Sequence, residues 1–540
     1  AERRDTERRG GMTSDQPPIP GESDLDPIVV HPGVNGDVTG WSPSPPALHA
    51  SWLPAPDPAI PPGHGQSPPP PELAAPPSGK RAYSLDALRG LFLILMTMGF
   101  TIGVASFFPE WMFHRQEPWG AEVPLDVAGI SWRDLAYVSF LFTMAAALPL
   151  TMSRRIEKGE LEIGIILAGV RRFALLLIYA IMIGHSNTYF LGYTQPARVL
   201  SIVGFVIMAM VFTRRRADWD EKKYKLINRA GWLLAIAFLA LSPMTYDKLF
   251  SFNRNDDVIV GLAFASLWGI VTWYFTRDNL VARLGVLAAT IALYLGAKGD
   301  GWVASFWWDA NLPWLFSAQR FALLAIVIPG TIMGDVILRW MRAPENPSEK
   351  AAWHSLRLGG LTLLTIGFTP LVTIGMYNRW VGLTTLLCVA MIIGGSFLTW
   401  DPRTPTERML RSLFIWGSAW LMIGLFLEPF ENGIRKLPDT LSYFFTVTGT
   451  TSMLLVALTA LVDALKRRKW VSVMIDVGHN PLMMYVMYTI LINATLEMIP
   501  PMRGFMLGSM WPAIVRSILS VVLVVAVVRM MSRKRIYWRT

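Results

Sequence analysis

Cysteine is almost absent from this chain: Cys388 is the only one among 540 residues. A single cysteine excludes an internal disulfide, a cysteine-based zinc cluster and a cysteine-pair redox centre. Charged side chains are also scarce, at 16% of the residues, whereas hydrophobic ones reach 52%. This balance is too apolar for a soluble enzyme of such length, and it predicts an all-α protein that crosses a membrane many times.

Signatures of nucleotide and metal chemistry are missing as well. The chain contains no Walker loop, no Gly-rich dinucleotide fingerprint, no His-Glu-x-x-His motif and no Gly-x-Ser-x-Gly elbow. We therefore expect no metal. The net charge is +10, but in a membrane protein the cations mark the cytoplasmic loops, so we expect no nucleic-acid partner.

Residues 1–80 differ from the rest of the chain in composition. They are rich in proline, glycine, serine and acids, as in "PPGHGQSPPPPELAAPPSGK", and carry no periodic apolar stripe. Such a segment cannot bury enough apolar surface to offset its chain entropy. We expect a disordered tail that stays in the cytoplasm, because no signal-peptide pattern precedes it. A membrane domain follows over residues 81–540.

Apolar runs long enough to cross about 30 Å of hydrocarbon recur from Leu88 onward. We predict 11–14 transmembrane helices, with fourteen as the best count and both chain ends in the cytoplasm. The predicted spans are 88–108, 135–153, 163–185, 197–213, 230–247, 257–276, 280–297, 319–338, 359–377, 380–399, 410–428, 440–464, 481–499 and 512–531.

The charge of the loops supports this alternation. Predicted inner loops such as "TRRRADWDEKKYKLINR" are rich in Lys and Arg, whereas outer ones such as "AKGDGWVASFWWDANLPW" are acidic, aromatic or nearly neutral. Lys and Arg accumulate on the cytoplasmic side, so the pattern favours an even number of helices in a bacterial inner membrane. The 277–283 connection and the spans near 380 and 481 stay open as re-entrant segments.

Asp86 and Arg89 lie at the start of the first span, in "YSLDALRGLFLILMTMGF". A helix N-terminus favours an acid, and the spacing puts both side chains on one face. Arg89 suits a lipid phosphate or a pairing with Asp86. Chemistry alone therefore leaves a helix cap and a binding pair equally open.

Several blocks in order resemble one family. "SLDALRGLFLILMTMGF", "GISWRDLAYVSFLFTMAAALPLTMSRR", "GIRKLPDTLSYFFTVTG" and "GHNPLMMYVMY" are similar to the heparan-α-glucosaminide N-acetyltransferase family and its bacterial DUF5009-type relatives, in the wider acyltransferase-3-like group. The resemblance covers residues 83–490. It implies a membrane acyltransferase that passes an acetyl or other acyl group from cytosolic acyl-CoA to a sugar or lipid-linked acceptor on the outer side. Membrane lipids are the expected surroundings, and a homodimer stays open.

The family places a catalytic histidine in the first outer loop, as His-x-x-Trp-x-Gly. Here the same count reaches Pro124, and His114, which precedes Trp119, is the only histidine of that loop. We take His114 as the candidate base or nucleophile, because an imidazole takes up a proton or an acyl group near neutral pH. Asp126 and Asp134 are the nearest carboxylates in sequence. Asp134 is preferred because it stands at the start of a helix, although the dipole alone would favour an acid there.

Polar residues at membrane depth are further candidates. His185, at the outer end of the third predicted span, is the second choice for a catalytic histidine. Arg171 and Arg172 lie within the same span, where they suit the phosphates of CoA or reach the cytosolic headgroups.

Three residues late in the chain complete the candidate binding set. Arg435 and Lys436 are cations in an outer loop otherwise poor in them, and they suit an anionic acceptor. Asn480 matches the resembled family just before Pro481, where helix capping would also explain it.

Two functions from other classes stay open. A transporter or flippase for a polar lipid or sugar would use the many spans without consuming acyl-CoA. A non-catalytic scaffold in envelope biosynthesis would show a phenotype on deletion, but not on substitution of His114 or His185.

Overall fold

The computed structural model describes residues 81–102, 108–118, 123–192, 194–245, 250–312, 314–344, 353–499 and 509–540. All of them fall in one compact unit, Leu73–Thr540, which is almost entirely helical. The predicted tail over 1–80 lies outside the described residues, as does Trp119.

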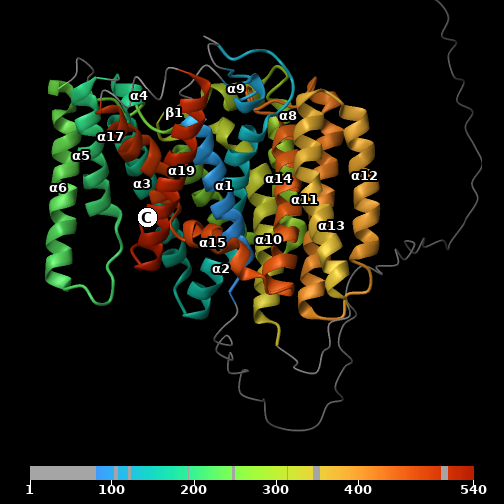
Figure 1. Cartoon of the computed structure of the whole chain (residues 1–540). Coiled ribbons are helices and arrows are strands. Elements are labelled where there is room, and N and C mark those ends of the chain that lie inside the picture. The colour runs from blue at the N-terminus through green and yellow to red at the C-terminus, as the bar shows by residue number, and fades with distance from the viewer. Residues whose placement is uncertain are drawn as a thin grey trace, which may run out of the picture. The chain divides into compact units, whose positions relative to one another are not determined.

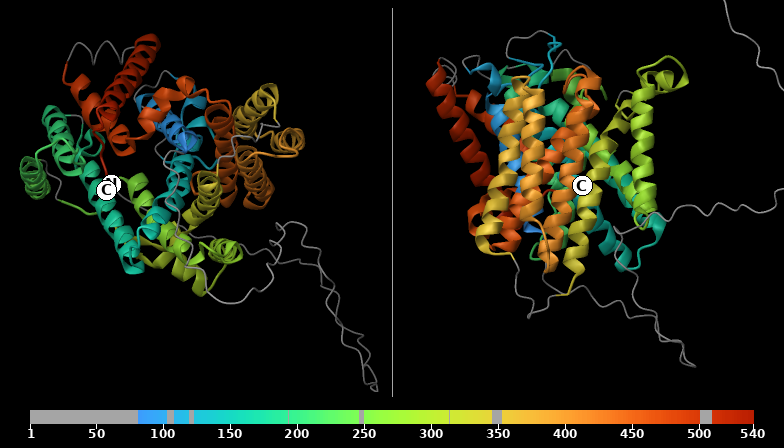
Figure 2. Two further views of the ribbon diagram at one scale, coloured as in Figure 1. Left: turned by 90° about the horizontal axis from the view of Figure 1, so that it is seen from below. Right: turned by 90° about the vertical axis from the view of Figure 1, so that its right-hand side faces the viewer.

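Long apolar helices make up most of this unit, and Figures 1 and 2 show them running side by side. Within the described residues, twelve helices are long and apolar enough to cross a membrane. Three of them include a short flanking helix: η2 (Trp132–Asp134) precedes α2, η3 (Ala318–Leu323) precedes α10, and the π-helix η5 (Ala460–Ala464) follows α14. The twelve are α1 (Tyr83–Ile102), α2 (Leu135–Glu157), α3 (Glu162–Ser186), α5 (Gln195–Phe212), α6 (Glu221–Thr245), α7 (Asp257–Thr276), α10 (Leu324–Arg342), α11 (Ser355–Tyr377), α12 (Val381–Leu398), α13 (Pro405–Leu427), α14 (Leu441–Thr459) and α19 (Met510–Arg533). The predicted all-α membrane class is confirmed.

The predicted count of fourteen spans is not confirmed at two segments. The first, 280–297, forms α8 (Leu280–Gly296), an apolar helix shorter than the other spans. The second, 481–499, is divided into α16 (Pro481–Val486), the π-helix η7 (Met487–Ile492) and α17 (Asn493–Glu497). Pro481 begins α16, as suits a residue without a backbone N–H, and the π-helix η7 interrupts the segment further along.

Short elements occupy the connections. They are η1 (Glu110–Met112), α4 (Thr188–Leu191), α9 (Trp302–Asp309), η4 (Pro429–Glu431), η6 (Arg468–Val471), α15 (Ser472–Gly478) and a small hairpin of β1 (Asn311–Leu312) and β2 (Phe316–Ser317). We call the end of the bundle at which α1 begins the basal end and the opposite one the distal end. In Figure 1 the α5–α6 connection lies at the basal end, and α9 lies at the distal end.

The core of the bundle lies at α2, α10 and α14. In the most apolar 18-residue stretch of α14, 94% of the residues are buried. The share is only 17% in the corresponding stretches of α6 and α12, which lie at opposite flanks in Figure 1. One pair of hydroxyl groups links two of these helices, since Ser139 of α2 and Thr451 of α14 share a hydrogen bond of 2.6 Å. Such pairing offsets the cost of burying a polar group away from water.

A close crossing of α1 and α15 shapes the basal end. A Cβ atom added to Gly90 would lie 1.8 Å from the carbonyl oxygen of Met474, and one added to Gly478 would lie 1.9 Å from that of Asp86. Only glycine lets the two backbones approach so closely. The crossing brings His479, which follows α15, beside the first turn of α1.

Candidate functional site

A cavity of about 710 Å³ lies at the distal end, bordered by α1, α2, α7, α8, α9 and the loop before α14. Concave sites that combine apolar walls with a few polar groups are where small molecules usually bind. Charged and polar side chains from these elements line the cavity: His114, Glu117, Arg133, Tyr137, Asp257, Lys298, Arg320, Glu431, Lys436 and Asp439.

His114 and Asp134 meet in the wall of this cavity. His114 follows η1, Asp134 ends η2, and the distance from His114 Nδ1 to Asp134 Oδ1 is 2.5 Å. An ionised carboxylate only accepts hydrogen bonds, so Nδ1 carries the hydrogen and donates it. In the neutral ring, Nε2 then keeps its lone pair. The structure thus brings together the histidine and the preferred carboxylate of the sequence analysis.

The carboxylate of Asp134 is held rigidly. Its side chain is fully buried, and Oδ2 accepts hydrogen bonds from Ser131 N at 2.7 Å and from Ser131 Oγ at 3.1 Å. Arg115 N donates to the same oxygen at 3.4 Å, and the hydroxyl of Tyr443 donates to the Asp134 carbonyl at 2.6 Å. Ser131 caps η2 with the serine-to-acid spacing of a capping box. Local helix capping therefore fixes the orientation in which the Asp134 side chain contacts His114.

Lys436 lies against the imidazole of His114. Its Nζ is 3.3 Å from Nδ1 and 3.4 Å from Nε2, and these near-equal distances place the ammonium beside the ring. Burial lowers the pKa of His114 below its usual 6.5, the charge of Lys436 lowers it further, and Asp134 opposes both. The imidazole is consequently neutral near pH 7, which is the form that accepts a proton or attacks a carbonyl.

Gln116 fixes the loop that carries His114. Its buried side chain donates from Nε2 to the carbonyls of Val127 and Gly129, both at 2.9 Å. Its Oε1 accepts from the backbone N–H of Lys436 at 3.3 Å. The same amide group therefore positions both the histidine loop and the segment that carries Lys436.

Asp126 is not a partner of His114, contrary to the alternative left open by the sequence. Its carboxylate is 84% exposed and pairs with Arg435, the cation predicted to bind an anionic acceptor. The chain between Val127 and Ser131 forms neither helix nor strand, and η2 begins directly after it and presents Asp134 to the histidine. Sequence proximity alone did not distinguish the two acids.

His185, the second choice for a catalytic histidine, lies apart from this cavity. It is buried at the end of α3, where Nδ1 contacts the carbonyl of Ile181 at 3.0 Å and the ring stacks on Phe250 at 5.0 Å. Its Nε2 has no hydrogen-bond partner within the described residues. Since no carboxylate in the described part of the chain contacts it, the structure gives His185 the setting of a packed side chain.

The basal end gathers the predicted Asp86 and Arg89. Asp86 contacts Arg89 at 3.4 Å, Arg81 at 2.9 Å and His479 Nε2 at 3.2 Å. Arg89 also donates to the carbonyl of Thr143 at 3.2 Å, which ties α1 to α2. Asp86 is thus a shared acceptor for three cationic or ionisable groups.

Arg172 adds an unsatisfied guanidinium to this region. Its Nε is buried without a hydrogen-bond partner among the described residues, and Arg89 and Arg539 lie within electrostatic reach of it. Arg171, by contrast, is exposed on the outer face of α3. The proximity of Arg89, Arg172 and Arg539 favours an anion at the basal end.

Asn480, predicted to bind substrate, hydrogen-bonds the protein backbone after α19. Its Nδ2 donates to the carbonyl of Ile536 at 3.0 Å, and its Oδ1 accepts from the N–H of Trp538 at 3.1 Å. The side chain therefore holds the segment after α19 against α16.

Most charged residues of the cavity were not singled out by the sequence, and Arg320, Asp257 and Asp439 are examples. Arg320 pairs with Asp257 at 2.7 Å, and the protein around the Asp439 carboxyl, which borders the cavity, raises its pKa to about 7. No local pattern marks them, because Asp257 begins α7, Arg320 lies in η3 and Asp439 lies in the loop before α14. The Ser-x-x-Asp spacing at 131–134 was a usable signal for Ser131. In the described ranges no group of three or more His, Cys, Asp or Glu side chains is arranged to hold a metal ion.

Comparison with protein families shows where the chain has a relative. Residues 81–337 match a family model described as a domain of unknown function, DUF5009. The match runs from the start of α1 into α10 and includes both His114 and Asp134. No curated protein matches the chain. The DUF5009-type part of the resemblance seen in the sequence is supported, and an acetyltransferase activity is a matter for proposal.

Proposed function

We propose that this protein is a membrane acyltransferase that moves an acetyl or other acyl group from acyl-CoA to a sugar or lipid-linked acceptor. The observation that carries the proposal is the 2.5 Å contact between His114 and Asp134 in the wall of the distal cavity. A histidine oriented by a buried carboxylate is the arrangement that general-base and nucleophilic catalysis need.

Two routes use the same side chains. In the first, Nε2 of His114 attacks the thioester carbonyl, the C–S bond breaks, and the acyl group passes from the imidazole to the acceptor. In the second, Nε2 removes a proton from the acceptor hydroxyl or amine while that atom attacks the thioester directly. In both, Asp134 stabilises the positive imidazole, and the ammonium of Lys436 is placed to stabilise negative charge on the carbonyl oxygen.

The acceptor fits the distal cavity. Trp307 and Trp308 contribute aromatic faces on which a sugar ring stacks, and Arg320, Lys436 and Asp439 contribute charged partners around them. This mixture of flat apolar and hydrogen-bonding groups suits a polar carbohydrate better than a hydrocarbon chain.

The donor enters from the basal end in this proposal. Arg89 and the unpartnered Arg172 would hold the CoA phosphates. From there the acyl arm follows α1, whose residues Met96 and Gly99 line the distal cavity. At about 1.5 Å of rise per residue, Gly99 lies about 15 Å beyond Arg89, a distance that an extended thioester arm covers. The charge of the loops supports a cytoplasmic basal end, in a bacterial inner membrane.

The test is CoA release by the purified protein in nanodiscs, with glucosamine-type and lipid-linked acceptors. We expect His114→Ala to lower the rate by about 10²–10⁴-fold, the range for a lost general base. His185→Ala is the matched control, since it removes a histidine outside the cavity, and it should keep the wild-type rate. Thermal unfolding of both variants verifies folding. Wild-type protein that releases no CoA with any acceptor would reject the proposal.

A transporter is the second candidate, because the region from α15 to α17 is a discontinuous helix, a feature of substrate sites in transporters. Uptake of a labelled sugar or lipid headgroup into vesicles, without CoA release, would favour it. Transport would then be insensitive to His114→Ala unless the substrate contacts that ring.

A further inference from the structure

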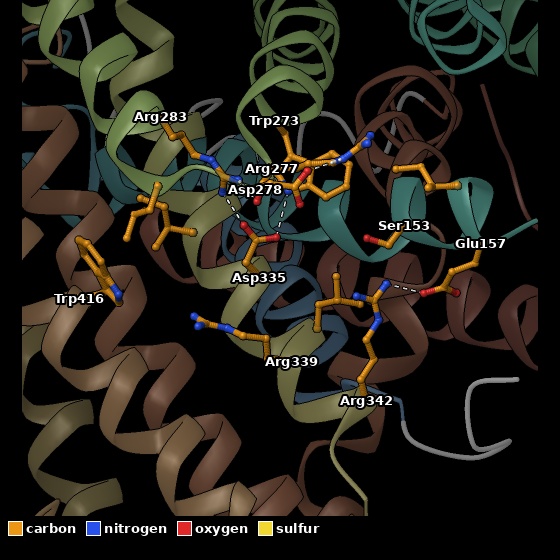
Figure 3. A pocket seen from close by; sticks show the side chains of 14 residues that line it. Ser153, Glu157, Trp273, Arg277, Asp278, Arg283, Asp335, Arg339, Arg342 and Trp416 are labelled. Carbon is orange, nitrogen blue, oxygen red and sulfur yellow. Dashed lines mark hydrogen bonds and ion pairs between the residues drawn. The ribbon is translucent and has the colours of Figure 1, made fainter. Parts of the chain in front are cut away.

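A second cavity, of about 440 Å³, lies at the basal end between α2, α7, α8, α10 and α13. Figure 3 shows its side chains, and most of the charged ones lie at helix ends. Four arginines and three acids line it: Arg277, Arg283, Arg339, Arg342, Glu157, Asp278 and Asp335.

Two of the arginines are already neutralised. Arg283 is buried and pairs with Asp335 at 2.5 Å, and Asp335 also accepts from the indole N–H of Trp273 at 3.0 Å. Arg342 pairs with Glu157. These dashed contacts in Figure 3 join α10 to its neighbours, to α7 and α8 through Asp335 and to α2 through Arg342.

The other two arginines keep unused donors. The side chain of Arg339 makes no hydrogen bond or ion pair with any described residue, and Figure 3 shows it extending toward Trp416. Arg277 donates from Nε to Asp278 at 3.2 Å, but Asp278 is 89% exposed, and Nη1 of Arg277 is buried without a partner in the described part of the chain. The mouth of the cavity therefore has donors free for an anion.

The deeper wall of the cavity is apolar. Ile332 lies about 15 Å from Arg342 along α10, at about 1.5 Å of rise per residue, and Trp416 lies near the middle of α13. The cavity thus changes from cationic at the helix ends to apolar at membrane depth. A free phosphate ion would contact only the cationic end of the cavity. A phospholipid would contact both ends, with its phosphate at the arginines and an acyl chain along the apolar wall.

We propose that this cavity binds one anionic phospholipid of the basal leaflet. Its phosphate accepts hydrogen bonds from Arg277 and Arg339, and an acyl chain packs against Trp416 and Ile332. The site is separate from the distal cavity, so the inference does not depend on acyl transfer. A bound lipid would fill the space between α10 and α13.

Native mass spectrometry of the detergent-purified full chain tests this site. The probes are phosphatidylglycerol, phosphatidylcholine with the same chains, and inorganic phosphate. We expect phosphatidylglycerol to bind most tightly, and Arg339→Gln combined with Arg277→Gln to weaken it about tenfold or more, since charge-assisted hydrogen bonds are lost. Arg154→Gln, an exposed cation at the end of α2 outside the cavity, is the matched control and should change the affinity less than twofold.

The apolar wall of the cavity is tested by a further variant. Trp416→Ala should weaken phosphatidylglycerol while leaving the weak binding of inorganic phosphate unchanged, because only the lipid uses the apolar wall. Equal affinity for phosphatidylcholine, equal binding of free phosphate, or identical losses in Arg154→Gln and the double variant would overturn the proposal. Arg339→Lys, which keeps the charge, separates loss of binding from misfolding.

Discussion

His114 lies between groups that act on its proton in opposite directions. The contact with Asp134 favours the protonated ring, while burial and the nearby ammonium of Lys436 favour the neutral one. The second influence prevails, because the pKa of His114 lies below 6.5. The ring therefore combines a fixed tautomer with a free lone pair at neutral pH.

The pH profile of CoA release tests this balance. The rate should rise as His114 loses its proton, with a midpoint below pH 6.5. Lys436→Gln removes a cation that disfavours protonation, so the midpoint should move to higher pH. Lys298→Gln, which removes a cation paired with Glu431, should leave the midpoint in place. A midpoint that stays fixed or falls in Lys436→Gln would contradict the arrangement.

Substitution of each candidate acid by asparagine, in separate variants, compares the roles of Asp134 and Asp126. Asp134→Asn keeps the size of the side chain but removes the carboxylate charge that stabilises the positive imidazole. We expect CoA release to fall by about 10²-fold or more, the scale of general acid–base effects. Asp126→Asn, which changes an exposed carboxylate paired with Arg435, should stay within about twofold of wild type. Similar losses in both variants would speak against a specific role for Asp134.

Among the elements, the crossing of α1 and α15 is the tightest contact described. Gly90→Ala would place a methyl group 1.8 Å from the Met474 carbonyl oxygen, so the two helices must separate. We expect this change to lower the free energy of unfolding by about 1–3 kcal/mol, as overpacking does. The melting temperature of purified protein measures the effect. Gly285→Ala in α8, with nothing within 4 Å of the added carbon, is the control and should not destabilise, because alanine favours a helix more than glycine does.

The sequence predicted elements better than contacts between them. Apolar length located the long helices, because a span must satisfy its own backbone in lipid. The discontinuity over 481–499 was not predictable in detail, since a π-turn such as η7 depends on tertiary packing. Likewise, the choice of Asp134 over Asp126 depended on where a loop turns back, and Gln116 on which two carbonyls that loop brings together.

For the whole molecule, the proposed function depends on which end of the bundle faces the cytoplasm. Residues 222 and 300 lie at opposite ends of the bundle, with α6, α7 and α8 between them. In a Cys388→Ser background, Lys222→Cys and Asp300→Cys should react with an impermeant maleimide from opposite sides, residue 300 from outside. Labelling of both from one side would show that α8 does not cross, and inverted labelling would place the His114 cavity in the cytoplasm.

The separation of the basal arginines from the distal histidine has a consequence for proton balance under the proposed acyl transfer. In this scheme CoA withdraws from the distal cavity as the thiolate and takes up a proton at the basal end, where its phosphates are held, since thiols are protonated at neutral pH. A hydroxyl or neutral amine acceptor loses its proton through His114 at the distal end. Each turnover therefore consumes a proton on one side of the membrane and releases one on the other. A pH difference across the membrane changes the driving force by about 1.4 kcal/mol per unit, so an alkaline distal side pulls the acyl group outward.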